Sequence, residues 1–268
     1  MKQMILLYLL LVSASLFAAC SGGSTAAKLD ANSMSIDTMG LPYSWQANRV
    51  EATAYDNSQP PGAMGLPEHI QVNFGVTDPA DVQFGDPILY IIPVEEYKQL
   101  WDEAGNTAVS NNLNNLESIL KDKPDLNTAS LSALPYEAYV SIGAGNLAVT
   151  PQKEYLDTPW GSAVRYVARP MQGVDVILNY GVAYIAQGLT DDGKYLVSFF
   201  YPPLSTSALS NSVEEISEAE FQQANNEWAT YRQEKEDMLN ELSPSDWDPD
   251  LTTLDAVIGS LQFGGYGG

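Results

Sequence analysis

The sequence predicts an α+β fold, a mainly antiparallel β-sheet flanked by helices in an α/β/α sandwich. Apolar strand patterns cluster in the middle of the chain, and amphipathic helical patterns lie before and after them. The clustered strands cover residues 152–156, 162–169, 174–190 and 194–201. Asp191-Asp192-Gly193 turns the last two into a hairpin, which indicates antiparallel pairing. Their consecutive apolar residues are typical of strands covered on both faces.

The segments before this region predict two strands and two helices. Residues 69–76 alternate as one strand, and residues 87–92 form a continuous apolar one. Helical spacing follows at residues 94–104, and a second helix is expected from Ser110, a capping residue, to Pro124.

Two more helices are expected near the C-terminus. Ser217 and Glu220 form a capping box that begins a long helix, whose inward stripe is expected to start at Phe221. Ser243-Pro244 ends this helix. Asp248-Pro249 begins a final helix with proline at its first position.

The first 19 residues have the form of a signal peptide. Lys2 precedes residues 4–19, an uncharged and mostly apolar run. As a helix, these 16 residues reach about 24 Å, which is short of the roughly 30 Å hydrocarbon core of a membrane. The segment is therefore expected to be removed after export.

Cys20, the single cysteine, follows this run and precedes a stretch rich in serine and glycine. Leu16-Phe17-Ala18-Ala19-Cys20 resembles the lipobox of bacterial lipoproteins, with Phe17 where that pattern has a smaller aliphatic residue. The resemblance implies that Cys20 is lipidated and anchors the chain to a membrane outside the cytoplasm. A free buried cysteine and simple secretion are the alternatives. One cysteine cannot form an intramolecular disulfide.

The expected organisation is a signal peptide at 1–19, a lipidated flexible tether at 20–32, one globular domain at 33–263 and a flexible glycine-rich tail at 264–268. Hydrophobic residues make up 45% of the chain and aromatic residues 10%, which is enough for a core and excludes global disorder.

The chain is strongly acidic. Its 34 acidic and 12 basic residues give a net charge of −22, and loss of Lys2 with the leader makes the mature chain −23. Nucleic acid and direct contact with an anionic membrane surface are therefore not expected. Residues 214–255 carry 13 acids and two bases, a local net charge of −11. Such a stretch suits a solvated helix face, or a surface for cations or a basic partner.

The sequence assigns no catalytic, metal or cofactor site. His69 is the only histidine, which excludes histidine-rich zinc sites, and no Gly-x-Ser-x-Gly motif supplies a nucleophile for it. His69 is therefore expected to be structural. Ser118 and Lys121 match Ser-x-x-Lys, but the companion motifs of penicillin-recognising enzymes are missing from the sequence.

Asp246, Asp248 and Asp250 begin like a calcium loop. Leu251 and Val257 stand where such a loop needs glycine and a bidentate glutamate. Helix capping by Asp248 and Asp250 explains these residues better.

Arg165 and Arg169 are expected on one face of a strand. Their Cα atoms would lie about 13 Å apart, too far to grip one carboxylate together, so pairing with separate acids is expected. Paired carboxylates for glycoside hydrolysis cannot be singled out among the 34 acids. Fifteen tyrosines and five tryptophans are available to line a sugar or peptide groove or to fill the core.

Four segments resemble a group of uncharacterised bacterial lipoproteins, and the likeness spans most of residues 65–263. They are Gly65-Leu66-Pro67-Glu68-His69, Ile91-Ile92-Pro93-Val94-Glu95-Glu96-Tyr97, Gln187-Gly188-Leu189-Thr190-Asp191-Asp192-Gly193-Lys194-Tyr195 and Pro249-Asp250-Leu251-Thr252-Thr253-Leu254-Asp255. The hairpin and C-terminal helices are similar, more loosely, to PsbP-type α/β/α domains, which are mostly non-catalytic binding or assembly factors. That likeness concerns the fold.

The expected function is a lipid-anchored binding or envelope-assembly module without a cofactor, with an envelope protein or a glycan as its partner. The alternative is an extracytoplasmic hydrolase of glycan or peptide that uses carboxylates the sequence does not identify. A purely structural surface protein without a small-molecule site is the third candidate.

Overall fold

A seven-stranded antiparallel sheet forms the centre of the computed structural model, which describes residues 29–56, 58, 65–83, 85–135, 146–171 and 173–267. The strand order is β1-β2-β3-β9-β8-β6-β5. The strands are β1 (Trp45–Val50), β2 (His69–Phe74), β3 (Ile88–Pro93), β5 (Glu154–Thr158), β6 (Gly161–Ala168), β8 (Ala183–Thr190) and β9 (Tyr195–Tyr201). Two short pairs join β4 (Asn146–Leu147) to β7 (Pro170–Met171) and β10 (Ser205–Thr206) to β11 (Trp247–Asp248).

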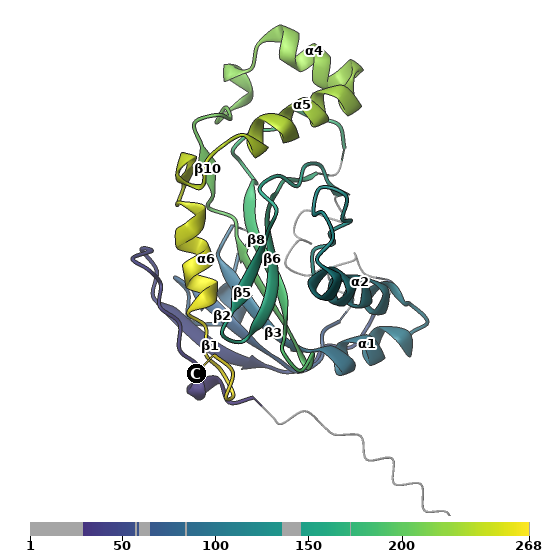
Figure 1. Ribbon diagram of the computed structural model, residues 1–268, viewed down its shortest axis with the longest axis vertical. Helices are drawn as coiled ribbons and strands as arrows, with labels where there is room; N and C mark the ends of the chain where they lie inside the picture. Colours follow the sequence, from purple (N-terminus) through teal and green to yellow (C-terminus); the bar gives the residue numbers. More distant parts are fainter. Residues whose placement is uncertain are drawn as a thin grey trace, which may run out of the picture.

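Helices cover both faces of the sheet, which confirms the expected α+β fold (Figure 1). Helices α1 (Val94–Asp102) and α2 (Ala108–Asp122) lie on one face, and α6 (Leu251–Gly259) lies on the other. Helices α4 (Glu218–Asn226) and α5 (Trp228–Asn240) stand at one end of the molecule. Every residue of β8 and β9 is buried, as the apolar runs of this hairpin predict.

The β8–β9 hairpin turns at Asp191-Asp192-Gly193, as expected. Gly193 has a φ of +69°, a left-handed conformation that favours glycine. The side chain of Asp192 accepts hydrogen bonds from Thr190 Oγ1 (2.9 Å) and from the backbone N–H of Lys194 (3.2 Å). These local bonds fix the turn and with it the register of the two central strands.

The expected strand at 174–190 is shorter than its sequence pattern, because only Ala183–Thr190 pairs with neighbouring strands. Asn179 instead binds the loop that follows β10, with its amide nitrogen 3.0 Å from Thr206 O and 2.9 Å from Leu209 O. Gly181, with a φ of +80°, then turns the chain into β8.

The expected long helix from Ser217 is two helices. Glu227 leaves the helical conformation (φ −132°, ψ 43°) after Asn225 and Asn226, residues of low helix propensity. The inward position expected for Phe221 is wrong, since its side chain is 39% exposed. The capping box is half confirmed, because Ser217 Oγ accepts a hydrogen bond from the Glu220 N–H at 3.1 Å.

Two other details differ from the sequence pattern. The pattern missed β1, an edge strand whose residues are only partly buried. The final helix begins at Leu251 and is capped by Asp250, which accepts from the Thr252 N–H at 2.7 Å, so Pro249 precedes the cap.

The two ends of the described chain lie side by side, at the end of the molecule away from α4 and α5 (Figure 1). Ser35 and Gln262 exchange two backbone hydrogen bonds of 3.0 Å. Ordered contacts continue beyond Phe263, because Tyr266 Oη donates to Asp192 at 2.9 Å. At the other end of the described chain, Leu29 packs against the core.

Candidate functional site

The joined chain ends form the floor of a surface groove between α6 and the edge strand β1. Ser260 Oγ donates to Val257 O (2.7 Å) and accepts from the backbone N–H of Asp37 (2.9 Å). This hydroxyl therefore ties the N-terminal segment to the end of α6. The contact joins residues 223 positions apart in the chain.

A tight turn shapes the rim of the groove. The Asp37 carboxylate accepts from the Met39 N–H at 2.8 Å, and Leu41 N–H donates to Thr38 O at 2.9 Å. Met39 and Gly40 both have positive φ values, 51° and 84°. The side chain of Met39 is 41% exposed at this turn.

Two aromatic side chains, Tyr43 and Trp45, form the wall of the groove. Both are half-buried, and they lie two residues apart, on one face of an extended segment. Trp45 Nε1 donates to Ile36 O at 3.0 Å, and the Tyr43 ring packs edge-on against Tyr201 with 6.2 Å between ring centres. These contacts hold both rings in place.

Gly75 supports the wall from the neighbouring strand end. Its N–H donates to Ser44 O at 2.9 Å, and its φ is +83°. A Cβ atom at this position would lie 3.2 Å from Tyr43 Cδ1, so the close approach of Tyr43 depends on glycine.

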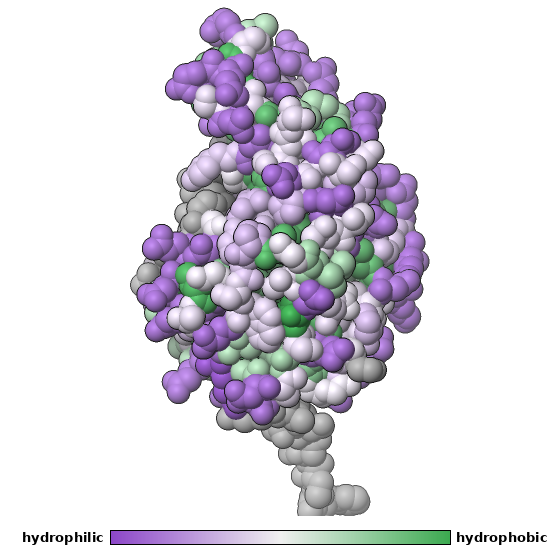
Figure 2. All heavy atoms as spheres, turned by 90° about the vertical axis from the view of Figure 1, so that its left-hand side faces the viewer, coloured by the Kyte–Doolittle hydropathy of each residue, from purple (hydrophilic) through white to green (hydrophobic). Residues whose placement is uncertain are grey.

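The groove is wide and nearly uncharged. It is an open depression in the surface, with a volume of about 840 Å³. It is lined by Ser35, Ile36, Asp37, Thr38, Met39, Tyr43, Ser44, Trp45, Ser260 and Gln262. Asp37 is the one ionisable carboxyl among them, in a chain of net charge −22. On the face with α6 and β1, weakly polar and apolar residues cover the middle, while strongly hydrophilic ones lie towards α4 and α5, along both flanks and at the lower edge (Figure 2).

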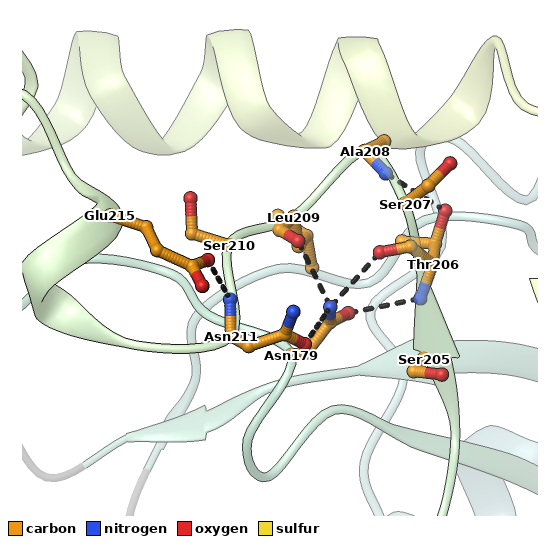
Figure 3. Close-up of a pocket in the computed structure, with 9 residues that line it drawn as sticks. All are labelled: Asn179, Ser205, Thr206, Ser207, Ala208, Leu209, Ser210, Asn211 and Glu215. Atoms are coloured by element: carbon orange, nitrogen blue, oxygen red, sulfur yellow. Dashed lines mark hydrogen bonds between the residues drawn. The ribbon is translucent and has the colours of Figure 1, made fainter.

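A second cleft, of about 500 Å³, lies at the loop that follows β10. Figure 3 shows the side chain of Asn179 at its centre, hydrogen bonded to Thr206, Leu209 and Asn211. Glu215 accepts from the Asn211 N–H at 2.8 Å. These polar groups bind one another, and their hydrogen bonds fix the conformation of the loop. The groups left for a ligand are mainly serine hydroxyls.

The expected lipidation residue, Cys20, lies outside the described residues. His69 is 5% exposed, and its Nδ1 lies 2.8 Å from Pro67 O. Burial lowers the pKa of His69, against the opposing effect of this contact. The His69 ring lies 5.8 Å from the ring of Tyr90. These surroundings fit the structural role expected for it.

The other sequence candidates do not line the groove. Ser118 Oγ donates to Asn114 O within α2, at 2.9 Å. Asp250 caps α6, as expected, whereas the capping role expected for Asp248 is wrong, because Asp248 lies in β11. Asp246 accepts from the Ser243 N–H at 2.7 Å and caps the turn that begins there. Within the ranges that the structure describes, no group of three or more histidine, cysteine or acidic residues could hold a metal ion.

Arg165 pairs with acids, as expected. The place expected for Arg169 on the same strand is wrong, because β6 ends at Ala168, one residue before it. Arg165 donates to Glu154 at 2.5 Å, and its Nε lies 3.4 Å from the carboxylate of Asp255. Burial raises the pKa of Asp255, although Arg165 and Tyr184 oppose this effect. Arg169 donates to Pro170 O and lies over the ring of Tyr180 at 6.0 Å.

The groove could not have been found by sequence reasoning, because its lining joins ordinary residues between Ser35 and Trp45 to Ser260 and Gln262 at the other end of the chain. The local signal was the Tyr-x-Trp spacing at the start of an unrecognised edge strand. Comparisons with protein-family models, with curated proteins and with solved structures found no match for the chain. Among the described residues, no helix has both the length and the apolar character needed to span a bilayer.

Proposed function

We propose that this protein is a lipid-anchored extracytoplasmic binding module whose groove takes an uncharged oligosaccharide of the cell envelope. The observation that carries the proposal is the groove lining, in which Tyr43 and Trp45 stand among hydroxyl and amide groups with one carboxylate. The lipobox-like sequence at Cys20 supports the anchor and the location.

The chemistry of the lining suits a sugar. A pyranose ring has an apolar C–H face that packs on aromatic rings, and a rim of hydroxyls that both donate and accept hydrogen bonds. Serine and threonine hydroxyls and the amide of Gln262 also do both. Asp37, held at the rim, adds an acceptor for a pair of sugar hydroxyls.

Electrostatics favour a neutral ligand over an anionic one. The chain carries a net charge of −22, which repels acidic polymers such as nucleic acid. A cationic ligand would find little charge in the groove itself, where Asp37 is the single carboxylate. An uncharged ligand depends on shape and hydrogen bonds, which the groove supplies.

The position of the groove suits an anchored protein. It includes Ser35, only a few residues after Leu29, where the described chain begins. The nine residues from Cys20 to Leu29 can span at most about 32 Å. A lipid on Cys20 would therefore keep the groove close to the membrane surface, among the polymers of the envelope.

The test is calorimetric titration of the mature chain, as its Cys20→Ser form, with neutral hexasaccharides of α-glucan, β-glucan, xylan, mannan and chitin type. At least one should bind, and Trp45→Ala should weaken that binding at least tenfold. Tyr180→Ala, which removes a 70% exposed aromatic ring elsewhere, is the matched control and should leave binding unchanged. Circular dichroism checks that each variant is folded.

Absence of binding to the whole panel, or binding that survives Trp45→Ala, would contradict the proposal. The same mixtures are assayed for new reducing ends. Their appearance would replace the binding module with the glycan hydrolase that the sequence leaves as the alternative.

A further inference from the structure

Helices α4 and α5 form a hairpin at the end of the molecule away from the joined chain ends (Figure 1). Of the nine residues of α4, only Ala224 is buried. A helix this short gains little stability on its own, and here its main contact is with α5, while Ala224 joins the core. Its outer side is an unpartnered helix face, and Phe221 on that helix is 39% exposed.

A cleft of about 500 Å³ opens between the two helices. Carboxylates surround a partly apolar floor in this α4–α5 cleft. Its lining is Ala219, Glu220, Gln223, Glu227, Tyr231, Glu234, Lys235 and Met238. Tyr231 is fixed in place because its hydroxyl donates to Glu220 (3.2 Å) and accepts from the Ile177 N–H (2.9 Å).

The α4–α5 cleft already binds one ammonium group, which belongs to the chain itself. Lys235 Nζ lies 2.7 Å from the Glu220 carboxylate and 5.5 Å from the centre of the Tyr231 ring. A carboxylate and an aromatic face together are a recognised environment for a lysine or arginine side chain. The contacts of Lys235 are therefore an example, within the chain, of how this cleft binds an ammonium group.

More negative charge is present than this lysine neutralises. Glu227 and Glu234 line the same cleft, and Glu234 is bonded to the neutral side chain of Gln223 at 2.7 Å. Residues 214–241 carry nine acids and two bases, a net charge of −7. Val213, just before this segment, is 49% exposed. Negative charge and exposed apolar side chains therefore occur together at this end.

We infer that the α4–α5 cleft docks a cationic, amphipathic segment of a partner protein. A lysine or arginine of that segment enters beside Glu227 and Glu234, with its methylene groups against Met238. The segment then continues around the outer side of α4, where its apolar residues cover Phe221, which lies outside the cleft lining. Charge complementarity identifies the occupant, since an acidic or neutral segment would leave these carboxylates unmatched. The inference is independent of the sugar groove, which lies at the other end of the molecule.

The test measures fluorescence anisotropy of three labelled peptides with the mature Cys20→Ser chain. The probes are an amphipathic peptide of lysine and leucine, its counterpart with glutamate in place of lysine, and an oligolysine of equal charge. The lysine–leucine peptide should bind at least tenfold more tightly than oligolysine, and the glutamate peptide should not bind. Calcium at millimolar concentration should not compete, which separates a peptide site from a cation site.

Variants separate the cleft from the overall charge of the chain. Glu227→Gln with Glu234→Gln should weaken the lysine–leucine peptide at least fivefold, and Phe221→Ser at least threefold. Glu117→Gln with Asp122→Asn changes the net charge equally at exposed positions of α2 and should alter binding less than twofold. Equal losses in both double variants, or no loss in either, would overturn the inference. Oligosaccharide titration of the same variants should be unchanged.

Discussion

The hydroxyl of Tyr184 on β8 donates a 2.8 Å hydrogen bond to the carboxylate of Asp255 on α6, which joins the sheet to the helix that covers it. The same carboxylate faces the guanidinium group of Arg165, whose side chain is only 3% exposed. Arg165 in turn donates to Gln152 O at 2.7 Å. This cluster fixes α6 against the sheet, and Ser260, the residue that follows α6, lines the groove of Tyr43 and Trp45.

Asp255→Ala should lower the free energy of unfolding by about 3 kcal/mol, because it leaves Arg165 buried with less compensating charge. Glu154→Gln is the matched control at the second partner of Arg165. Its side chain is 58% exposed, so the loss should stay under about 1 kcal/mol. Urea unfolding of both variants measures the difference. Equal losses would show that α6 does not depend on the buried partner.

The buried histidine predicts how stability changes with pH. Burial lowers the pKa of His69 below its usual 6.5. At a pH between the lowered pKa of the folded chain and 6.5, the unfolded chain binds a proton that the folded chain does not. The contribution of His69 to the free energy of unfolding is therefore full above pH 6.5 and declines as the pH falls through 6.5.

His69→Gln should remove this part of the pH dependence. The stability difference between the natural chain and the variant, measured by urea unfolding, should be larger at pH 7.5 than at pH 5.5. Taking the difference cancels the carboxylates that titrate in both proteins. A difference that stays constant between the two pH values would show that His69 is protonated as readily in the folded chain as in the unfolded one.

Gly75→Ala should weaken oligosaccharide binding although Gly75 is outside the groove lining. The new methyl group would press on Tyr43, 3.2 Å away, and the φ of +83° disfavours alanine. Unfolding should become about 1–2 kcal/mol easier, the usual range for alanine in a left-handed position. Gly105→Ala, at a φ of +79° with open space around it, controls for the backbone effect and should leave binding intact.

The lipid anchor is tested by metabolic labelling. The full chain, expressed in a bacterium that is fed an alkyne analogue of palmitate, should become labelled and lose its first 19 residues. Cys20→Ser should abolish the label and release the protein from the membrane fraction. An unlabelled natural chain with its leader still attached would remove the anchor from the proposed function.

Local patterns predicted the parts of the fold that local interactions decide. Helix α1 was predicted because Val94, Tyr97 and Trp101, all buried, repeat at helical spacing. The β8–β9 hairpin was predicted because its turn residues and apolar arms are adjacent in the sequence. These features need no knowledge of distant segments.

Distant contacts decide the rest. The groove depends on the hydrogen bond between Asp37 and Ser260, which are 223 residues apart in the chain, and no sequence pattern predicts such a contact. The break at Glu227 was missed for a different reason: the two asparagines before it are a weak local signal, and the apolar helical spacing continues across the break. In strand β1, apolar and polar residues alternate too weakly for the strand to be recognised. It is an edge strand with a neighbouring strand on one side only, so its side chains are less buried than those of the central strands.

The most direct measurement is a ¹⁵N correlation spectrum of the mature chain, in which each of the five tryptophans gives one indole N–H signal. Assignment by single substitution identifies Trp45. Saturation with the oligosaccharide that binds best should shift the Trp45 signal and leave those of the buried Trp101, Trp160 and Trp247 in place. A bound oligosaccharide that moves none of the five signals, or moves Trp228 on α5 instead, would contradict the groove as the binding site.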